Sequence, residues 1–95
     1  MTTELLAKMR DLKPEITKRF GAKEIQLFGS NVRGEETEDS DIDVLVEFEE
    51  GADLFDLMGL ANFLEEQLQR KVDVISKRAL RDELRDSILR EAVPV

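Results

Sequence analysis

Hydrophobic side chains recur every three or four positions in three segments of the chain, which is the spacing of an amphipathic helix. The first segment covers residues 3–20, and Pro14 within it predicts either two short helices or one bent helix. The second covers residues 53–69, with Asp53 as its N-cap. Its expected core-facing stripe is Leu54, Leu57, Met58, Ala61, Leu64 and Leu68. The third follows Ser76 as its cap and ends before Pro94.

Three shorter segments have the patterns of β-strands. Residues 42–48 alternate, with hydrophobic side chains on one face and carboxylates grouped on the other. Residues 24–28 and 72–75 are short apolar runs next to turn-forming positions. The order helix, strand, turn, strand, helix, strand, helix predicts an α/β (α+β) domain. We expect a small mixed sheet of at least three strands flanked by helices, formed by residues 1–95 as one domain.

Composition narrows the chemistry available to this chain. It has no cysteine and no histidine, so any metal must be held by oxygen atoms, which favours magnesium, manganese or calcium. The net charge of −8 disfavours direct binding to a nucleic acid backbone and favours a neutral or basic protein partner. No apolar run is long enough for a membrane span, and the N-terminus lacks the pattern of a signal peptide. We therefore expect a cytoplasmic protein.

Three carboxylates stand inside or beside predicted strands, where an isolated charge is costly. Asp41 and Asp43 are two positions apart, so their side chains leave one face of the strand about 6.6 Å apart. Asp73 can join them if its strand pairs beside theirs. Such a group can hold two Mg²⁺ ions, or Mn²⁺, roughly 3.5–4 Å apart.

A glycine-serine turn, Gly29-Ser30, follows the first predicted strand, and its backbone can cradle phosphate groups. Metal and phosphate sites together indicate phosphoryl or nucleotidyl transfer. An Asp-x-Asp pair or a Gly-Ser turn alone is weak, because both are common in caps and surface loops. The aspartates at 39, 41 and 43 also match part of a calcium EF-hand loop. Val44 occupies the position that requires glycine there, which argues against that interpretation.

The combined pattern resembles the minimal nucleotidyltransferase domain of the DNA polymerase β-like superfamily. It consists of Gly29-Ser30-x-x-Arg33-Gly34, then Ser40-Asp41-x-Asp43, then a distant strand aspartate, Asp73. The ending Glu91-Ala92-Val93-Pro94 is also similar to the C-terminus of this family. The resemblance covers nearly the whole chain. One departure is Asn31-Val32, where the family often has arginine or tyrosine followed by alanine.

The resemblance implies roles for these residues. Asp41 and Asp43 would bind the metal ions, and Asp73 would complete the metal site and help to activate the attacking hydroxyl. The remaining motif residues would contact the nucleotide or brace its loop: Gly29, Ser30, Arg33 and Ser40.

Small stand-alone members of this family resemble antitoxins that are paired with HEPN-domain ribonuclease toxins. The resemblance therefore implies a Mg²⁺-dependent enzyme that transfers AMP from ATP to a hydroxyl of such a partner. Two alternatives stay open: an idle antitoxin that acts by occlusion, and an aminoglycoside-type nucleotidyltransferase acting on a small molecule. The chain has no sequence for a second, acceptor-binding domain, which disfavours the latter.

Overall fold

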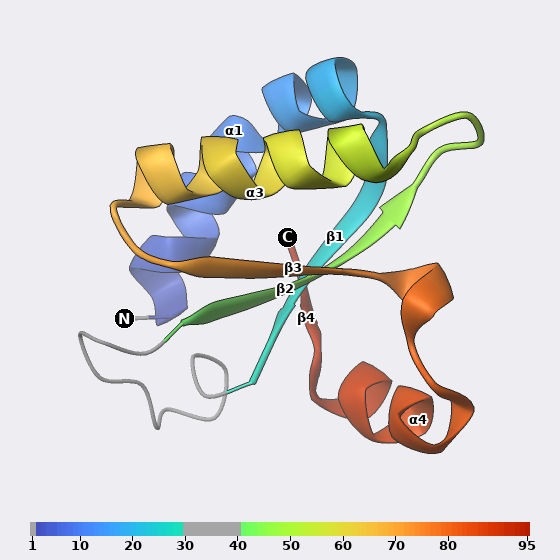
Figure 1. The fold of residues 1–95 in the computed structure, drawn as a ribbon. Helices are drawn as coiled ribbons and strands as arrows, with labels where there is room; N and C mark the ends of the chain where they lie inside the picture. The colour runs from blue at the N-terminus through green and yellow to red at the C-terminus, as the bar shows by residue number, and fades with distance from the viewer. Residues whose placement is uncertain (1, 30–40) are drawn as a thin grey trace.

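The computed structural model describes residues 2–29 and 41–95 (Figure 1). Helix α1, Thr2–Phe20, continues through Pro14 as one helix. Gly21 ends it in the left-handed conformation, and its N–H donates to the Thr17 carbonyl. The other elements follow in the order β1 (Ala22–Phe28), β2 (Ile42–Phe48), α3 (Leu54–Leu68), β3 (Val72–Ser76), the 3-10 helix η1 (Lys77–Ala79), α4 (Asp82–Glu91) and β4 (Val93–Pro94).

The four strands form one mixed sheet in the order β3-β2-β1-β4. Strand β1 lies antiparallel to both β2 and β4, whereas β2 and β3 are parallel. The parallel pair needs a long crossover, and α3 supplies it. The predicted fold class and the three predicted strands are thus confirmed, and β4 is added to them.

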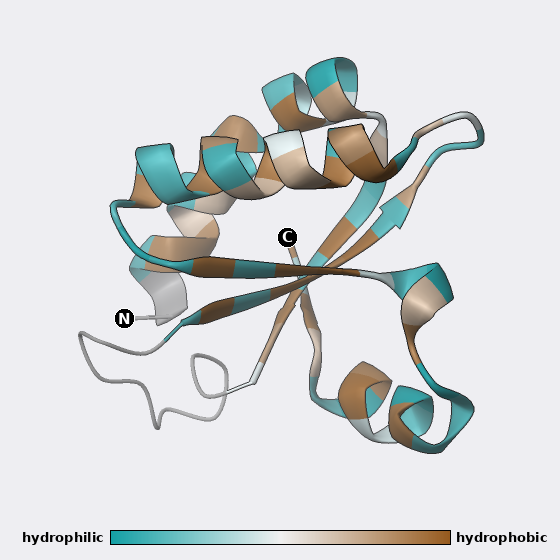
Figure 2. Cartoon of the chain, in the orientation of Figure 1, coloured by the Kyte–Doolittle hydropathy of each residue, from teal (hydrophilic) through white to brown (hydrophobic). Residues whose placement is uncertain are grey.

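Helices α1 and α3 cover one face of the sheet, and α4 lies on the opposite side (Figure 1). The strands between them are largely hydrophobic (Figure 2). Ile42, Val44 and Val46 are fully buried in the main core, as their alternation predicts. Leu45 points to the other face and is also buried. The alternation therefore gives the face of each residue correctly, but it does not indicate that the second face is also covered at Leu45.

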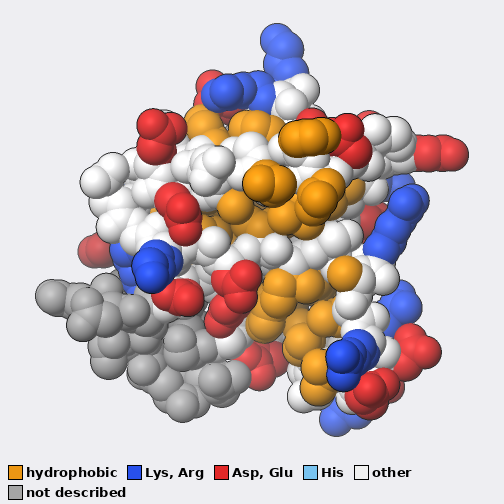
Figure 3. All heavy atoms as spheres, viewed as in Figure 1, with side chains coloured by type: hydrophobic (Ala, Val, Ile, Leu, Met, Phe, Trp, Pro, Cys, Tyr) orange, Lys and Arg blue, Asp and Glu red, His pale blue; other side chains and the backbone are white. Residues whose placement is uncertain are grey.

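Helix α3 begins with the predicted cap. Asp53 and Asp56 form a reciprocal capping box, in which each carboxylate accepts from the other residue's backbone N–H. The predicted apolar stripe is partly wrong, however, because Leu54 is 67% and Met58 52% exposed, while Leu60 and Phe63 are buried. Almost every side of the first three turns carries a hydrophobic residue, so the spacing alone does not decide which side faces the sheet. Exposed hydrophobic side chains are visible in Figure 3.

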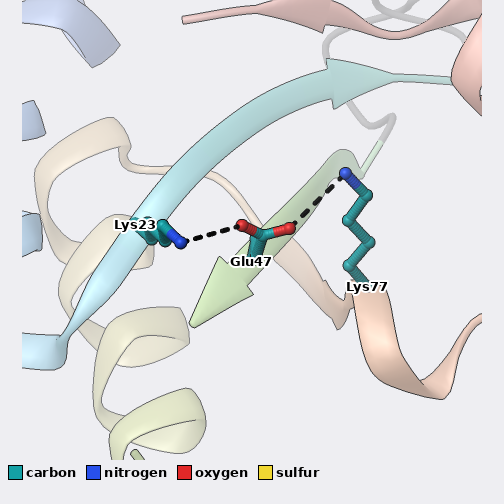
Figure 4. Close-up of polar contacts among 3 residues, drawn as sticks. All are labelled: Lys23, Glu47 and Lys77. Atoms are coloured by element: carbon teal, nitrogen blue, oxygen red, sulfur yellow. Dashed lines mark ion pairs between the residues drawn. The ribbon is translucent and has the colours of Figure 1, made fainter. Parts of the chain in front are cut away.

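Ser76 does not cap the last helix, contrary to the sequence prediction. It pairs with Val46 as the final residue of β3, and η1 and a short link precede α4. On the sheet, Glu47 of β2 lies between Lys23 of β1, at 3.9 Å, and Lys77 of η1, at 3.6 Å (Figure 4). These ion pairs are solvent-exposed or partly so, and each contributes at most about 1 kcal/mol.

Among the described residues, no helix is both long enough and apolar enough to cross a membrane.

Candidate active site

Asp43 and Asp73 lie side by side on adjacent strands. They are direct partners in the parallel pairing of β2 and β3, so their side chains leave the same face of the sheet. Their neighbours Ile42, Val44, Val72 and Val74 are buried on the face that α1 and α3 cover. The two carboxylates therefore stand on the face opposite those helices. The condition stated from the sequence, that the strand of Asp73 pairs beside that of Asp43, is met.

Asp41 immediately precedes β2 and is exposed. The next residue, Ile42, donates its N–H to the carbonyl of Lys71, at 2.9 Å, which ties the start of β2 to the start of β3. All three predicted aspartates thus belong to one corner of the sheet. The same corner contains the end of β1, because β1 runs antiparallel and its last residue, Phe28, pairs with Asp43.

Gly29 packs directly against Asp43. Its φ of +82° lies in the left-handed region, where a side chain is disfavoured. A Cβ at this position would also overlap the Asp43 carboxylate, with the Asp43 Cγ only 3.1 Å away. Two independent requirements, conformation and space, therefore demand glycine here. The turn that was predicted to hold phosphate is in contact with a predicted metal ligand.

A carboxylate that the sequence prediction did not assign to the site also reaches the turn. Glu91, the last residue of α4, accepts a hydrogen bond from the Gly29 N–H through Oε1, at 2.7 Å. The only sequence signal was the position of Glu91 in the family-like ending, and nothing in that pattern links it to Gly29. The link arises because β4 brings the C-terminus alongside β1.

The donor set fits a hard divalent cation in its chemistry. The aspartates at 41, 43 and 73 offer only carboxylate oxygens, and the Asp43 carboxylate fits into the space that Gly29 leaves without a side chain. Within the described part of the chain, no three acidic side chains converge tightly enough to form a ready metal centre. Asp41 and Asp73 are exposed, so rotation of their side chains is sterically possible and would be needed to bring the carboxylates onto a shared ion.

Three of the predicted site residues, Ser30, Arg33 and Ser40, lie outside the described residues. The residues that flank them, Gly29 and Asp41, are both at the corner described above. The EF-hand interpretation is wrong, because residues 42–48 form a strand of the sheet rather than a calcium-binding loop.

A small mixed sheet with paired aspartates beside a glycine turn defines the nucleotidyltransferase class, and the sequence agrees. Residues 9–95 match the nucleotidyltransferase domain family, and the chain belongs to this family. It is 46% identical over 83 residues to the protein adenylyltransferase MntA of Thermococcus cleftensis, a match that covers 87% of this chain and 84% of that protein.

Solved structures agree with the fold. A protein assigned as a minimal nucleotidyltransferase superimposes with a TM-score of 0.86 and 44% identity, over 100% of this chain and 97% of the other. More distant matches show the fold alone. One is a toxin-antitoxin with AMP-PNP, with a TM-score of 0.73 and 23% identity over 88% of this chain and 69% of that one. Another is a complex of a tri-AMPylated Shewanella oneidensis HEPN toxin with its MNT antitoxin, with a TM-score of 0.67 and 22% identity over 99% and 71%.

Proposed function

We propose that this chain is a Mg²⁺-dependent protein adenylyltransferase, an antitoxin that transfers AMP from ATP to a hydroxyl group of a HEPN ribonuclease toxin in the cytoplasm. The observation that carries the proposal is the corner where Gly29 packs on Asp43 and Asp43 stands in register with Asp73. It occurs in a chain that is 46% identical to an MntA adenylyltransferase.

The nucleotide is held between the turn and the carboxylates. Gly29 and Ser30 form the turn that accepts the triphosphate, with Arg33 and Ser40 beside them, and the missing side chain of Gly29 lets the turn lie directly against Asp43. The aspartates at 41, 43 and 73 hold magnesium, or manganese in its place. When bound, these ions supply positive charge that offsets the charge of the triphosphate.

The acceptor comes from the partner protein. Its hydroxyl oxygen attacks the α-phosphorus of ATP, and the bond from that phosphorus to the bridging oxygen breaks, so pyrophosphate leaves and AMP stays on the partner. The hydroxyl proton passes to Asp73, since the chain has no histidine that could accept it. Docking of the partner holds its hydroxyl in line with the α-phosphorus.

Charge supports a protein partner of this kind. The chain has 22 acidic and 14 basic residues, and a ribonuclease must carry basic groups to bind RNA. An acidic antitoxin is therefore attracted to the surface that it has to neutralise.

Intact-mass spectrometry of a HEPN toxin incubated with this protein, ATP and Mg²⁺ tests the proposal. We expect one or more added AMP groups with the parent protein, and at least a hundredfold slower addition with Asp73→Asn, the loss typical of a missing general base. Asp11→Asn, an exposed aspartate on α1, is the matched control and should act like the parent. Neutralisation of the toxin without a mass change, equally by the Asp73 variant, would instead establish occlusion.

A further inference from the structure

The hydrogen bond between Glu91 and Gly29 joins residues that are 62 positions apart in the chain. Strand β4 pairs Val93 with Leu27, so two more antiparallel steps would place residue 91 opposite residue 29. Residue 91 is not part of a strand, however, because α4 extends to Glu91 and the Ala92 N–H donates to the Ile88 carbonyl. The Glu91 side chain thus supplies the acceptor that a longer strand would have supplied.

This contact is well placed to fix the turn. The Gly29 amide is part-buried, and a backbone N–H that loses its acceptor away from water is costly. The segment that carries Glu91 is itself anchored, since the Val95 N–H donates to the Ile25 carbonyl and Lys13 Nζ donates to the Val95 carbonyl, at 2.9 Å.

Gly29 in turn constrains Asp43, because the two residues are in contact through the space where a Cβ would lie. We propose that Glu91 is a positioning residue of the nucleotide site: its carboxylate holds the Gly29 amide, and so sets the turn against Asp43 before ATP binds. The inference rests on the proposed function. Within that function Glu91 sets the turn, and its carboxylate accepts the hydrogen bond of the Gly29 N–H.

The role requires an acceptor oxygen at this place rather than a negative charge. Glu91→Gln keeps the oxygen and removes the charge, whereas Glu91→Ala removes both. Glu83→Ala, an exposed glutamate in the first turn of α4, is the matched control. If Glu91 acted only through charge, Gln and Ala would behave alike.

Two measurements on the full chain test the proposal. In the nucleotide-free protein, hydrogen exchange of the Gly29 amide, followed by NMR, should be roughly tenfold faster in Glu91→Ala and near the parent rate in Glu91→Gln. By calorimetry with Mg²⁺, ATP should bind roughly tenfold more weakly to Glu91→Ala and within twofold of the parent to Glu91→Gln. Unchanged Gly29 exchange or unchanged ATP affinity in Glu91→Ala would overturn the proposal.

Tighter ATP binding by Glu91→Ala would also overturn the proposal, since Glu91 would then compete with phosphate for the Gly29 amide.

If Glu91→Ala does not fold, Glu91→Asp is used instead, because its side chain is one methylene group shorter and its carboxylate lies farther from the Gly29 N–H. Weaker ATP binding at an unchanged unfolding temperature supports positioning, and unchanged binding refutes it. If the parent protein binds no ATP, the proposed function fails. The hydrogen-exchange rate of the Gly29 amide and the carboxyl ¹³C shift of Asp43, compared between the parent and the Glu91 variants, still decide whether Glu91 sets the turn.

Discussion

At the scale of single residues, comparing Gly29 with Gly51 separates the two reasons why the turn needs glycine, namely backbone conformation and the space beside Asp43. Both have positive φ, at +82° and +97°, but a Cβ on Gly29 would overlap Asp43, whereas a Cβ on Gly51 would meet nothing within 4 Å. Gly51→Ala should therefore lower the free energy of unfolding by about 1 kcal/mol, the cost of placing a side chain on a left-handed backbone. Gly29→Ala should lower the free energy of unfolding by about 1–3 kcal/mol more than Gly51→Ala does, because the new methyl group overlaps Asp43. It should also bind ATP more weakly, because Asp43 is displaced.

Urea denaturation and calorimetry with ATP and Mg²⁺ measure both effects. Equal losses of stability in the two variants would show that Asp43 moves aside at little cost. Normal ATP binding by Gly29→Ala would show that the turn only ends the strand.

Metal dependence is a second prediction at this scale. The predicted metal ligands are the carboxylates of the aspartates at 41, 43 and 73, so the negative triphosphate and these side chains repel each other unless a cation lies between them. ATP should bind at least tenfold more tightly with Mg²⁺ or Mn²⁺ than with a chelator, and Asp43→Asn should lose most of that gain. Calorimetry under both conditions checks this, with Asp11→Asn as the control. Equal affinities with and without metal would exclude the predicted site.

The sequence indicated that Asp43 and Asp73 could come together if their strands were neighbours, because both residues are placed in predicted strands, and the parallel pairing of β2 and β3 meets that condition. It could not predict the contact of Glu91 with Gly29. That contact depends on a strand of two residues, Val93–Pro94, which is too short to show a period in the sequence. It includes a proline, which is tolerated at an edge strand such as β4.

At the scale of elements, α3 shows how a helix with hydrophobic residues on most sides is oriented by its neighbours. The Phe20 and Phe63 rings lie 5.6 Å apart, and the Arg19 guanidinium lies over both, which joins α1 to α3 beside the buried Phe63. This packing turns Leu60 inward and leaves Phe55 82% exposed. The sequence alone could not make that choice, because both sides satisfy the helical period.

Two alanine variants in α3 test that orientation. Leu60→Ala should destabilise the protein by about 2–5 kcal/mol, because it leaves a cavity against the sheet. Phe55→Ala should change stability by no more than about 0.5 kcal/mol. Urea denaturation of the two variants measures the difference. Similar losses for both would mean that Phe55 is covered in the folded protein, contrary to its exposure here.

At the scale of the whole molecule, charge should govern how fast the partner is found. The chain carries a net charge of −8, so its field attracts a basic protein over distances comparable to the screening length, about 8 Å at physiological ionic strength. Contacts at the interface act at shorter range and are screened less. Salt should therefore slow association much more than it changes dissociation.

Stopped-flow measurements with the proposed HEPN toxin can separate these two rates. Raising the salt from about 0.05 M to 0.5 M should lower the association rate constant by about tenfold or more, while the dissociation rate constant changes by less than about threefold. Asp11→Asn and Asp86→Asn, which are exposed and lie on α1 and α4, each remove one charge outside the catalytic corner. Combined, they should slow association modestly and leave the rate of AMP transfer within the bound complex unchanged. A salt-independent association rate would show that docking relies on shape and apolar contact, and that the acidic composition has no part in recognising the partner.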